Sequence, residues 1–163
     1  MAIVYFDASA LVKLVVEEAG TEIAARLWDG CDAAVASRLA YPEVRAALAA
    51  SERNRELSRD DLLSAERSWQ EYWRAVRPVE LTSQVEQHAG QLARDHALRG
   101  ADAVHLASAL AVGPADLVVA AWDRRLRAGA GALGLRIAPA GLGEAEEVAE
   151  QDEAEEREAP SDS

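Results

Sequence analysis

The sequence predicts an α/β fold: a three-layer α/β/α sandwich around a central parallel sheet of four to five strands. Five short apolar runs, most of them rich in Val, Ile or Ala, recur along the first 140 residues. The segments between them are longer, and their apolar residues repeat at helical spacing. Alternation of short buried strands with helices is typical of a parallel sheet covered by helices on both faces.

Each expected strand is an apolar run bounded by polar or turn-forming residues, as in a buried parallel sheet. The run at 117–121 is the clearest, and the run at the N-terminus is interpreted as a strand rather than as an export signal. The expected strands cover residues 3–6, 33–36, 78–81, 117–121 and 135–138.

Helices are expected between the strands, and several begin at recognisable capping residues. Ser9 is expected to cap the first helix, and Ser58 with Asp61 resembles a capping box. Trp69 and Trp73 belong to an aromatic stripe at helical spacing, for which core or hairpin packing is favoured over a partner or base-stacking surface. The expected helices cover residues 10–16, 21–28, 41–48, 58–76, 83–98, 102–110 and 124–131.

The charge of the chain is unevenly distributed. The formal net charge is −12, and residues 144–163 alone carry ten acids and one Arg. We therefore expect a folded domain over residues 1–140 and an acidic, disordered tail over residues 141–163. Outside the tail, acids and bases nearly balance, so the total charge does not exclude a nucleic-acid substrate.

The sequence also indicates the setting in which the protein works. It contains one cysteine, Cys31, so no internal disulfide can form. No apolar run approaches the roughly 18–20 residues that a membrane span needs. The N-terminus lacks the basic and long apolar regions of a secretory signal. We therefore expect a reduced, cytoplasmic setting and no membrane partner.

Four acids stand out because each lies just after an expected strand or early in an expected helix: Asp7, Glu43, Asp102 and Asp123. Taken singly, such acids are ordinary, because a carboxylate at a helix start caps the helix or interacts with its dipole. The carboxyl ends of parallel strands, however, are where ligands bind in α/β folds. Four carboxylates in one pocket cannot all stay ionised without a cation, so the set predicts a metal site.

Carboxylate oxygens suit Mg²⁺ or Mn²⁺, and such a site activates water for in-line attack on a phosphodiester. No phosphate-binding Gly-rich loop, nucleophile elbow or dinucleotide fingerprint is present. Ser9 has no base at a suitable spacing, and a haloacid-dehalogenase-type phosphatase would need Asp at that position. His88 and His96 have no companion His or Cys at ligand spacing, so we expect ordinary surface or partly buried histidines. Together with His105 they do not make a zinc site.

The chain resembles PIN-domain proteins, and more narrowly the VapC-like ribonuclease toxins of bacterial toxin–antitoxin pairs. The resemblance covers about residues 2–139 and depends on four stretches in the family's order. They are residues 5–13 (YFDASALVK), Glu43 in its Ala-rich helix, residues 102–107 (DAVHLA) and residues 123–126 (DRRL).

The resemblance implies the same three-layer fold and endonucleolytic cleavage of RNA by a metal-activated water. It implies that Asp7 and Asp102 hold the divalent ion, Mg²⁺ or Mn²⁺. Glu43 would join them directly or through water, and Asp123 would orient water or a second ion. The implied partners are an RNA substrate and a cognate antitoxin whose peptide occupies the cleft. Homodimerisation through helices is also typical of the family.

One position departs from the family pattern. Ala121 stands where the family often carries Thr or Ser two residues before its last acid, here Asp123. The departure removes a hydroxyl from that side of the expected site. Ser9 could supply a hydroxyl near the site instead, and we treat it as a candidate substrate-binding residue.

Candidate phosphate-binding residues lie near the expected site in the sequence. Arg99, Arg124 and Arg125 could position RNA phosphates, with plain surface charge as the alternative. For the chain as a whole, the alternative to a metal-dependent endoribonuclease is a non-catalytic PIN-like module that binds RNA or protein.

Overall fold

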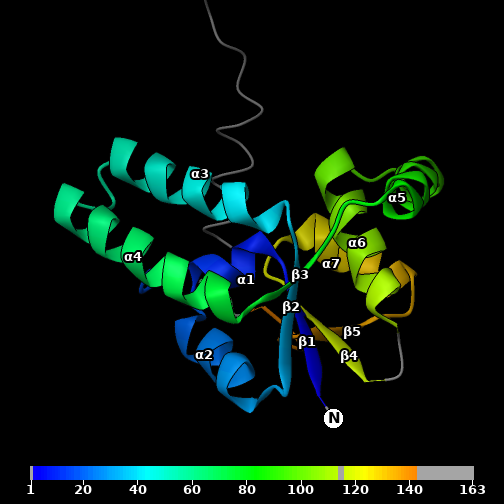
Figure 1. Cartoon of the computed structure of the whole chain (residues 1–163), viewed down its shortest axis with the longest axis horizontal. Helices are drawn as coiled ribbons and strands as arrows, with labels where there is room; N and C mark the ends of the chain where they lie inside the picture. The colour runs from blue at the N-terminus through cyan, green and yellow to red at the C-terminus, as the bar shows by residue number, and fades with distance from the viewer. Residues whose placement is uncertain (1, 114–115, 143–163) are drawn as a thin grey trace, which may run out of the picture.

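The computed structural model describes residues 2–113 and 116–142, and its centre is a single parallel sheet. The five strands lie in the order β3-β2-β1-β4-β5 (Figure 1), which confirms the predicted sheet. Their bounds are β1 Ile3–Phe6, β2 Ala33–Ser37, β3 Arg77–Val79, β4 Leu117–Ala120 and β5 Arg136–Ala138.

The strand order puts a topological switch at the middle of the sheet. Strand β1 pairs with β2 on one side and with β4 on the other, so that Ile3 lies opposite both Ala33 and Leu117. The chain first builds outward from β1 to β3 and then crosses to β4 on the other side. Ligands of such folds bind beyond the carboxyl ends of the strands at the switch, here the ends of β1 and β4.

Two helical layers cover the sheet, as predicted (Figure 1). Residues of β1 alternate between the layers: Val4 and Phe6 join the core beneath α1 to α4, whereas Tyr5 joins the core beneath α5 to α7. The helices are α1 Ala8–Val12, α2 Thr21–Gly30, α3 Ala40–Arg53, α4 Arg59–Ala75, α5 Ser83–Asp95, α6 Gly100–Val112 and α7 Arg124–Ala132.

The element boundaries correct the sequence predictions in a few places. Helix α1 begins at Ala8 and ends at Val12, and its cap is Asp7 rather than Ser9, because the Asp7 carboxylate accepts from the backbone of Ala10. Helix α5 ends at Asp95, three residues earlier than expected, and β3 ends at Val79. The predicted cap of α4 is confirmed, since the Asp61 amide donates to Ser58 Oγ at 3.1 Å.

The aromatic stripe of α4 packs inside the molecule, which confirms the favoured interpretation. Helices α3 and α4 form an antiparallel hairpin, and the Trp69 ring is fully buried between them and the sheet. Its centroid lies 5.9 Å from the Tyr41 ring and 5.3 Å from the Trp73 ring. These rings fill the core of the hairpin and are therefore not a base-stacking surface.

Helix α6 lies against the sheet with most of its length buried, and α7 packs closely on it. A Cβ atom on Gly129 would meet Leu106 Cδ1 at 2.8 Å and Leu98 Cδ2 at 2.9 Å, so a larger residue there would force these leucine side chains to move. Helices α6 and α7 thus pack against each other in the same layer of the fold.

The predicted tail, 141–163, lies outside the described residues apart from 141 and 142. Among the residues that the structure describes, no helix is long and apolar enough to cross a membrane.

Candidate functional site

The four predicted acids all stand at helix starts. Asp7 caps α1 and Asp123 caps α7, while Glu43 and Asp102 lie in the first turns of α3 and α6. The unpaired amide groups and the dipole at a helix start favour negative charge, so each position suits a carboxylate. Because α1 follows β1 and α7 follows β4, two of these acids lie at the switch of the sheet.

A serine hydroxyl joins the two strand-end acids. Ser9 Oγ donates to the Asp7 carboxylate, with Oδ1 at 2.8 Å and Oδ2 at 2.9 Å. The same oxygen accepts from the backbone amides of Trp122, at 2.8 Å, and Asp123, at 3.3 Å. Asp7 Oδ1 also accepts from Ala10 N, and Asp123 Oδ1 accepts from Leu126 N, both at 2.9 Å. The ends of β1 and β4 are thus linked through one side chain.

Burial makes the Asp7 carboxyl unusual. Its residue is 4% exposed, and desolvation raises its pKa to about 6. The charge of His105 and the hydrogen bonds from Ser9 and Ala10 act in the opposite direction, and the charge of Asp123 raises the pKa further. A nearby cation would stabilise the ionised form of a buried carboxyl of this kind.

Asp102 is half-buried, and its carboxylate has no hydrogen-bond partner among the described residues. Desolvation raises its pKa, as do the charges of Asp123 and, more weakly, Glu43. The charges of His105 and Arg99 lower it. Asp102 therefore shares an electrostatic environment with Asp123, Glu43 and His105.

His105 contacts one of the four acids, a role that the sequence prediction did not assign to it. It lies one turn after Asp102 on α6, and its side chain is 5% exposed. Its Nε2 lies 2.7 Å from Glu43 Oε2, and its Nδ1 lies 2.8 Å from the Tyr5 hydroxyl. The sequence held one signal for this, since His105 follows Asp102 by three residues and so shares its helix face.

The acids also determine the charge state of this imidazole. Burial, the largest single effect, lowers the pKa of His105, whereas the hydrogen bond and the charge of Glu43 raise it. The charges of Asp7 and Asp102 add to the effect, and the net result is a raised pKa. A positive charge on His105 partly compensates the surrounding carboxylates.

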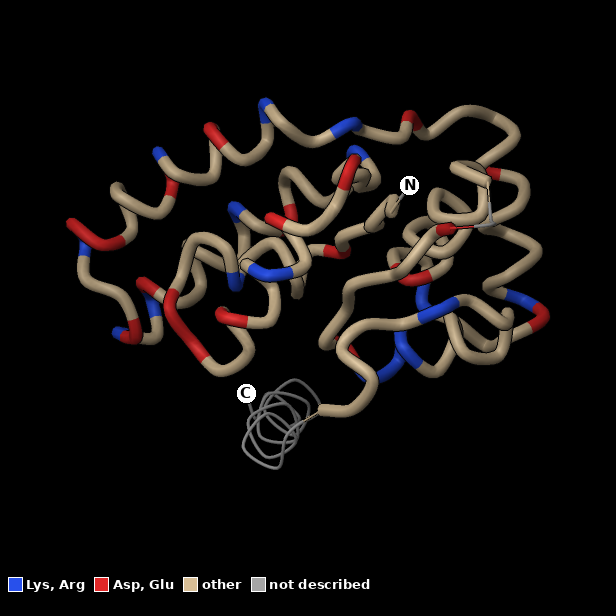
Figure 2. Tube along the Cα trace, turned by 90° about the horizontal axis from the view of Figure 1, so that it is seen from below, with Lys and Arg blue, Asp and Glu red and all other residues tan. Residues whose placement is uncertain are grey.

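A cavity of about 400 Å³ opens beside Asp102. Arg99 and Arg125 line it together with Asp102, and its remaining wall is formed by α7 and the segment that follows α5. Arg124 does not line this cavity. Arg127 is held by backbone carbonyl groups of Ala121 and Pro139, so its contacts are structural. Basic and acidic residues are interspersed over the described chain rather than separated (Figure 2).

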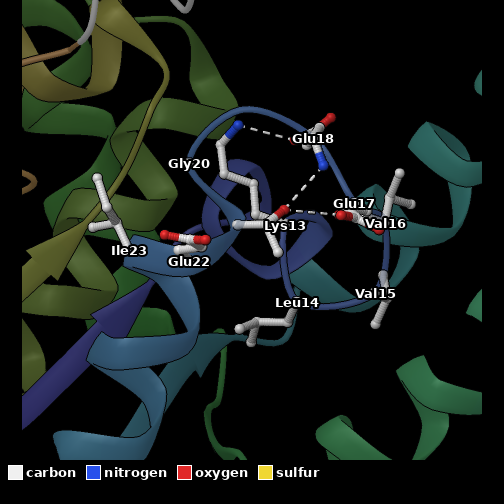
Figure 3. Close-up of a pocket in the computed structure, with 10 residues that line it drawn as sticks. Lys13, Leu14, Val15, Val16, Glu17, Glu18, Gly20, Glu22 and Ile23 are labelled. Atoms are coloured by element: carbon white, nitrogen blue, oxygen red, sulfur yellow. Dashed lines mark hydrogen bonds and ion pairs between the residues drawn. The ribbon is translucent and has the colours of Figure 1, made fainter.

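A second cavity, of about 560 Å³, follows α1 and is lined by residues 13–18 and 20–23 (Figure 3). Lys13 is buried there, with Nζ at 2.9 Å from Glu18 Oε1 and at 2.7 Å from the Ala19 carbonyl. The ammonium group also lies 5.2 Å from the centre of the Trp122 ring. Lys13 thus connects this cavity to Trp122, the residue that precedes Asp123.

A profile of the family described as PIN domain matches residues 4–131, which is most of the chain. The chain belongs to the PIN domain family. Its sequence is 68% identical over 142 residues to Ribonuclease VapC45 of Mycobacterium tuberculosis (strain CDC 1551 / Oshkosh) and, at the same level, to Ribonuclease VapC49 of strain ATCC 25618 / H37Rv. Each match covers 87% of this chain and 99% of the relative. The predicted resemblance to VapC-like PIN proteins is confirmed.

Solved structures with this fold agree with that assignment. VapC20 of Mycobacterium tuberculosis, described as a sarcin–ricin loop cleaving toxin, superposes with a TM-score of 0.59 at 21% identity, over 77% of this chain and 93% of that one. FitAcB of Neisseria gonorrhoeae gives 0.58 at 15% identity, over 82% and 95%. VapBC2 of Rickettsia felis, bound to promoter DNA, gives 0.55 at 10% identity, over 83% and 96%.

PIN-domain ribonucleases generally need a divalent metal ion, and the donor set here fits one chemically. The available ligands are carboxylate oxygens, and the pKa values of Asp7 and Asp102 are raised by burial and by neighbouring acids. Within residues 2–113 and 116–142, no three acid, His or Cys side chains form a ready-made metal cage. Mg²⁺ sites in proteins commonly have few protein ligands and keep several waters.

Proposed function

We propose that this protein is a Mg²⁺- or Mn²⁺-dependent endoribonuclease and the toxin of a toxin–antitoxin pair. One observation carries the proposal: Asp7 and Asp102, at two separate helix starts of a PIN-domain fold, both have raised pKa values, and the charge of Asp123 contributes to both. Two relatives at 68% identity are ribonucleases by name, and their whole length is matched.

In this proposal Asp7 and Asp102 hold the divalent ion, whose presence would lower the pKa of a water and stabilise charge on the scissile phosphodiester. Asp7 is supported by its burial and its raised pKa, and Asp102 by a carboxylate without a hydrogen-bond partner among the described residues. Glu43 accepts from His105 through Oε2 and, in this proposal, joins Asp7 and Asp102 at the ion directly or through water. Asp123 orients water from the start of α7.

The substrate-binding residues are proposed from the cavity beside Asp102. Arg99 and Arg125 line that cavity, so we assign them to the phosphates that flank the scissile bond. Arg124, the next residue of α7, is assigned to a more distant phosphate. Ser9 takes a positioning role, because its hydroxyl is engaged by Asp7 and by two backbone amides.

The partners follow from the same reasoning. Single-stranded or looped RNA is the substrate, and a cognate antitoxin silences the site, as the complexes among the structural relatives suggest. An RNA substrate is consistent with the cytoplasmic location expected from the sequence. Homodimerisation stays a prediction, and the domain division at residue 140 is likewise proposed from the sequence.

The test is cleavage of end-labelled RNA by the purified chain without antitoxin, in Mg²⁺, in Mn²⁺ and in EDTA. We expect cleavage with either metal, none in EDTA, and none by Asp102→Asn. Asp60→Asn is the matched control, because it removes a first-turn acid from α4, a helix without site residues. It should cleave like the wild type.

The outcomes separate the alternatives. Cleavage that persists in EDTA contradicts the metal mechanism. Binding of RNA without cleavage, in a protein shown by calorimetry to bind Mn²⁺, favours the non-catalytic binding module. In cells, induced expression of the wild-type chain should arrest bacterial growth, whereas Asp102→Asn should not, and co-expression of the cognate antitoxin should restore growth.

A further inference from the structure

We propose that His105 is a positioning residue that fixes the Glu43 carboxylate, and that Tyr5 in turn fixes the His105 ring. The inference rests on the proposed function, in which Glu43 contributes to the metal site. It adds to the four acids a series of hydrogen-bonded groups, uncharged or cationic, that connects the sheet to Glu43.

The series begins at the backbone of the sheet. The Ser37 amide, at the end of β2, donates to the Tyr5 hydroxyl at 3.2 Å. That hydroxyl lies 2.8 Å from His105 Nδ1, and His105 Nε2 lies 2.7 Å from Glu43 Oε2. Strands β1 and β2 are thereby connected to helices α6 and α3 through three consecutive side chains.

The identity of each donor and acceptor gives this series of hydrogen bonds a direction. An ionised carboxylate can only accept, so His105 Nε2 carries the proton that Glu43 Oε2 receives, whether the ring is neutral or cationic. In the neutral ring Nδ1 accepts from the Tyr5 hydroxyl, whose oxygen is free to accept from Ser37. In either charge state the ring presents an N–H group to Glu43.

Burial increases steadily away from the site. The Glu43 side chain is 29% exposed, the His105 side chain 5%, and Tyr5 is fully buried. The ring therefore has little freedom to turn, and the edge of the Tyr5 ring restrains it further through a T-shaped contact with centroids 6.0 Å apart. A rigid donor at this point limits the rotamers of Glu43, whose side chain lies in the first turn of α3 at a partly solvated position.

A residue that only filled space would not need both ring nitrogens. Here both are used, and the ring also faces two further acids, since its charge lowers the pKa values of Asp7 and Asp102. Orientation of carboxylate ligands by a second layer of hydrogen bonds is how metal sites are held in a competent geometry.

Two substitutions of His105 each retain one of its two hydrogen bonds and remove the other. The amide nitrogen of His105→Gln stands near the position of Nε2 and can still donate to Glu43. The amide of His105→Asn ends near Nδ1, so it can contact Tyr5 but cannot reach Glu43. We expect His105→Asn to lose about 10–100-fold in kcat and in Mn²⁺ affinity with KM for RNA unchanged, while His105→Gln stays within about threefold of wild type.

A double-mutant cycle with Glu43→Gln tests whether His105 acts through Glu43. Mn²⁺ affinity, measured by calorimetry on the protein without RNA, is the readout, so the cycle does not depend on cleavage. We expect His105→Asn to cost little further affinity in the Glu43→Gln background. Tyr5→Phe serves as a second variant if His105→Asn does not fold, with a smaller loss that also disappears in that background.

Each of the following results would overturn the inference about His105, and each can be distinguished from a failure of the proposed function. Equal losses for His105→Asn and His105→Gln, or losses that add to that of Glu43→Gln, would mean that His105 serves only to pack the core. Wild-type behaviour of His105→Asn or of Glu43→Gln contradicts it as well. Failure of the proposed function shows separately, as cleavage by Asp102→Asn or in EDTA.

Discussion

At the carboxyl ends of β1 and β4, Asp7 and Asp123 are fixed by backbone amide groups and joined through Ser9. On the helices, Glu43 is held by the His105 side chain, and Asp102 has no hydrogen-bond partner among the described residues. The strand-end acids are therefore part of the framework of the fold, whereas the helix acids are attached to it by side chains or left open. The same substitution should therefore change stability and activity differently in the strand-end half of the site, Asp7 and Asp123, and in the helix half, Glu43 and Asp102.

The largest expected effect is the loss of cleavage by Asp7→Asn and by Asp102→Asn, each by at least about 10³-fold, because each removes a proposed metal ligand. The measurement is kcat/KM for RNA at saturating Mg²⁺, with Asp60→Asn as the control. Substantial cleavage by either variant would contradict the assignment of that carboxylate.

Asp7→Asn and Asp102→Asn should differ in their effect on the free energy of unfolding. The pKa of Asp7 is raised to about 6, above its usual value, so its folded-state charge is destabilising once the pH exceeds that pKa. At pH 7.5 in EDTA, Asp7→Asn should therefore raise the free energy of unfolding by up to about 3 kcal/mol. This gain in the free energy of unfolding should shrink towards pH 5, where Asp7 is already protonated. The gain for Asp102→Asn should be smaller, because Asp102 is only half-buried. Denaturant unfolding at both pH values measures it.

Ser9→Ala should break the link between the strand-end acids. It leaves the Trp122 amide without its partner and removes the hydroxyl from Asp7, at a cost of about 1–3 kcal/mol in stability. Loss of the hydroxyl that orients a ligand should also lower kcat by about 10–100-fold. Ser9→Thr retains the hydroxyl and is the matched control. Equal behaviour of the two variants would mean that the hydroxyl does not position Asp7.

Metal affinity should depend on pH through Asp7. Protons compete with the ion for this carboxyl, so below its pKa of about 6 the Mn²⁺ affinity should fall by up to about tenfold for each pH unit. The charge of Asp123 raises the pKa of Asp7, so Asp123→Asn should move the midpoint to lower pH. Calorimetry between pH 5 and 7.5 follows both effects. A midpoint that does not move in Asp123→Asn would show that the strand-end acids do not interact.

The sequence predicted the strand-end half of the site better than the helix half. Short apolar strands followed by an acid placed Asp7 and Asp123, because parallel strands end at a common edge. The spacing of His105 from Asp102 places His105 on the same helix face, but no local pattern predicts its contact with Glu43, since the two are separated by 62 residues and belong to opposite helical layers. The cap of α1 was assigned to Ser9 because both residues are good caps, and only backbone geometry decides between neighbours.

The smallest expected effects concern the cavity beside Asp102. Arg99 and Arg125 line it from α6 and α7, and phosphate contacts near a surface are strongly screened by salt. Arg99→Gln and Arg125→Gln should each raise KM for RNA by about three- to tenfold at low salt and reduce the salt dependence of binding, with kcat unchanged. Arg53→Gln, which removes a cation from the far end of α3, is the control. Arg99 also lowers the pKa of Asp102, so a change in kcat for Arg99→Gln alone would show that this residue acts on the helix half of the acidic site rather than on the phosphates.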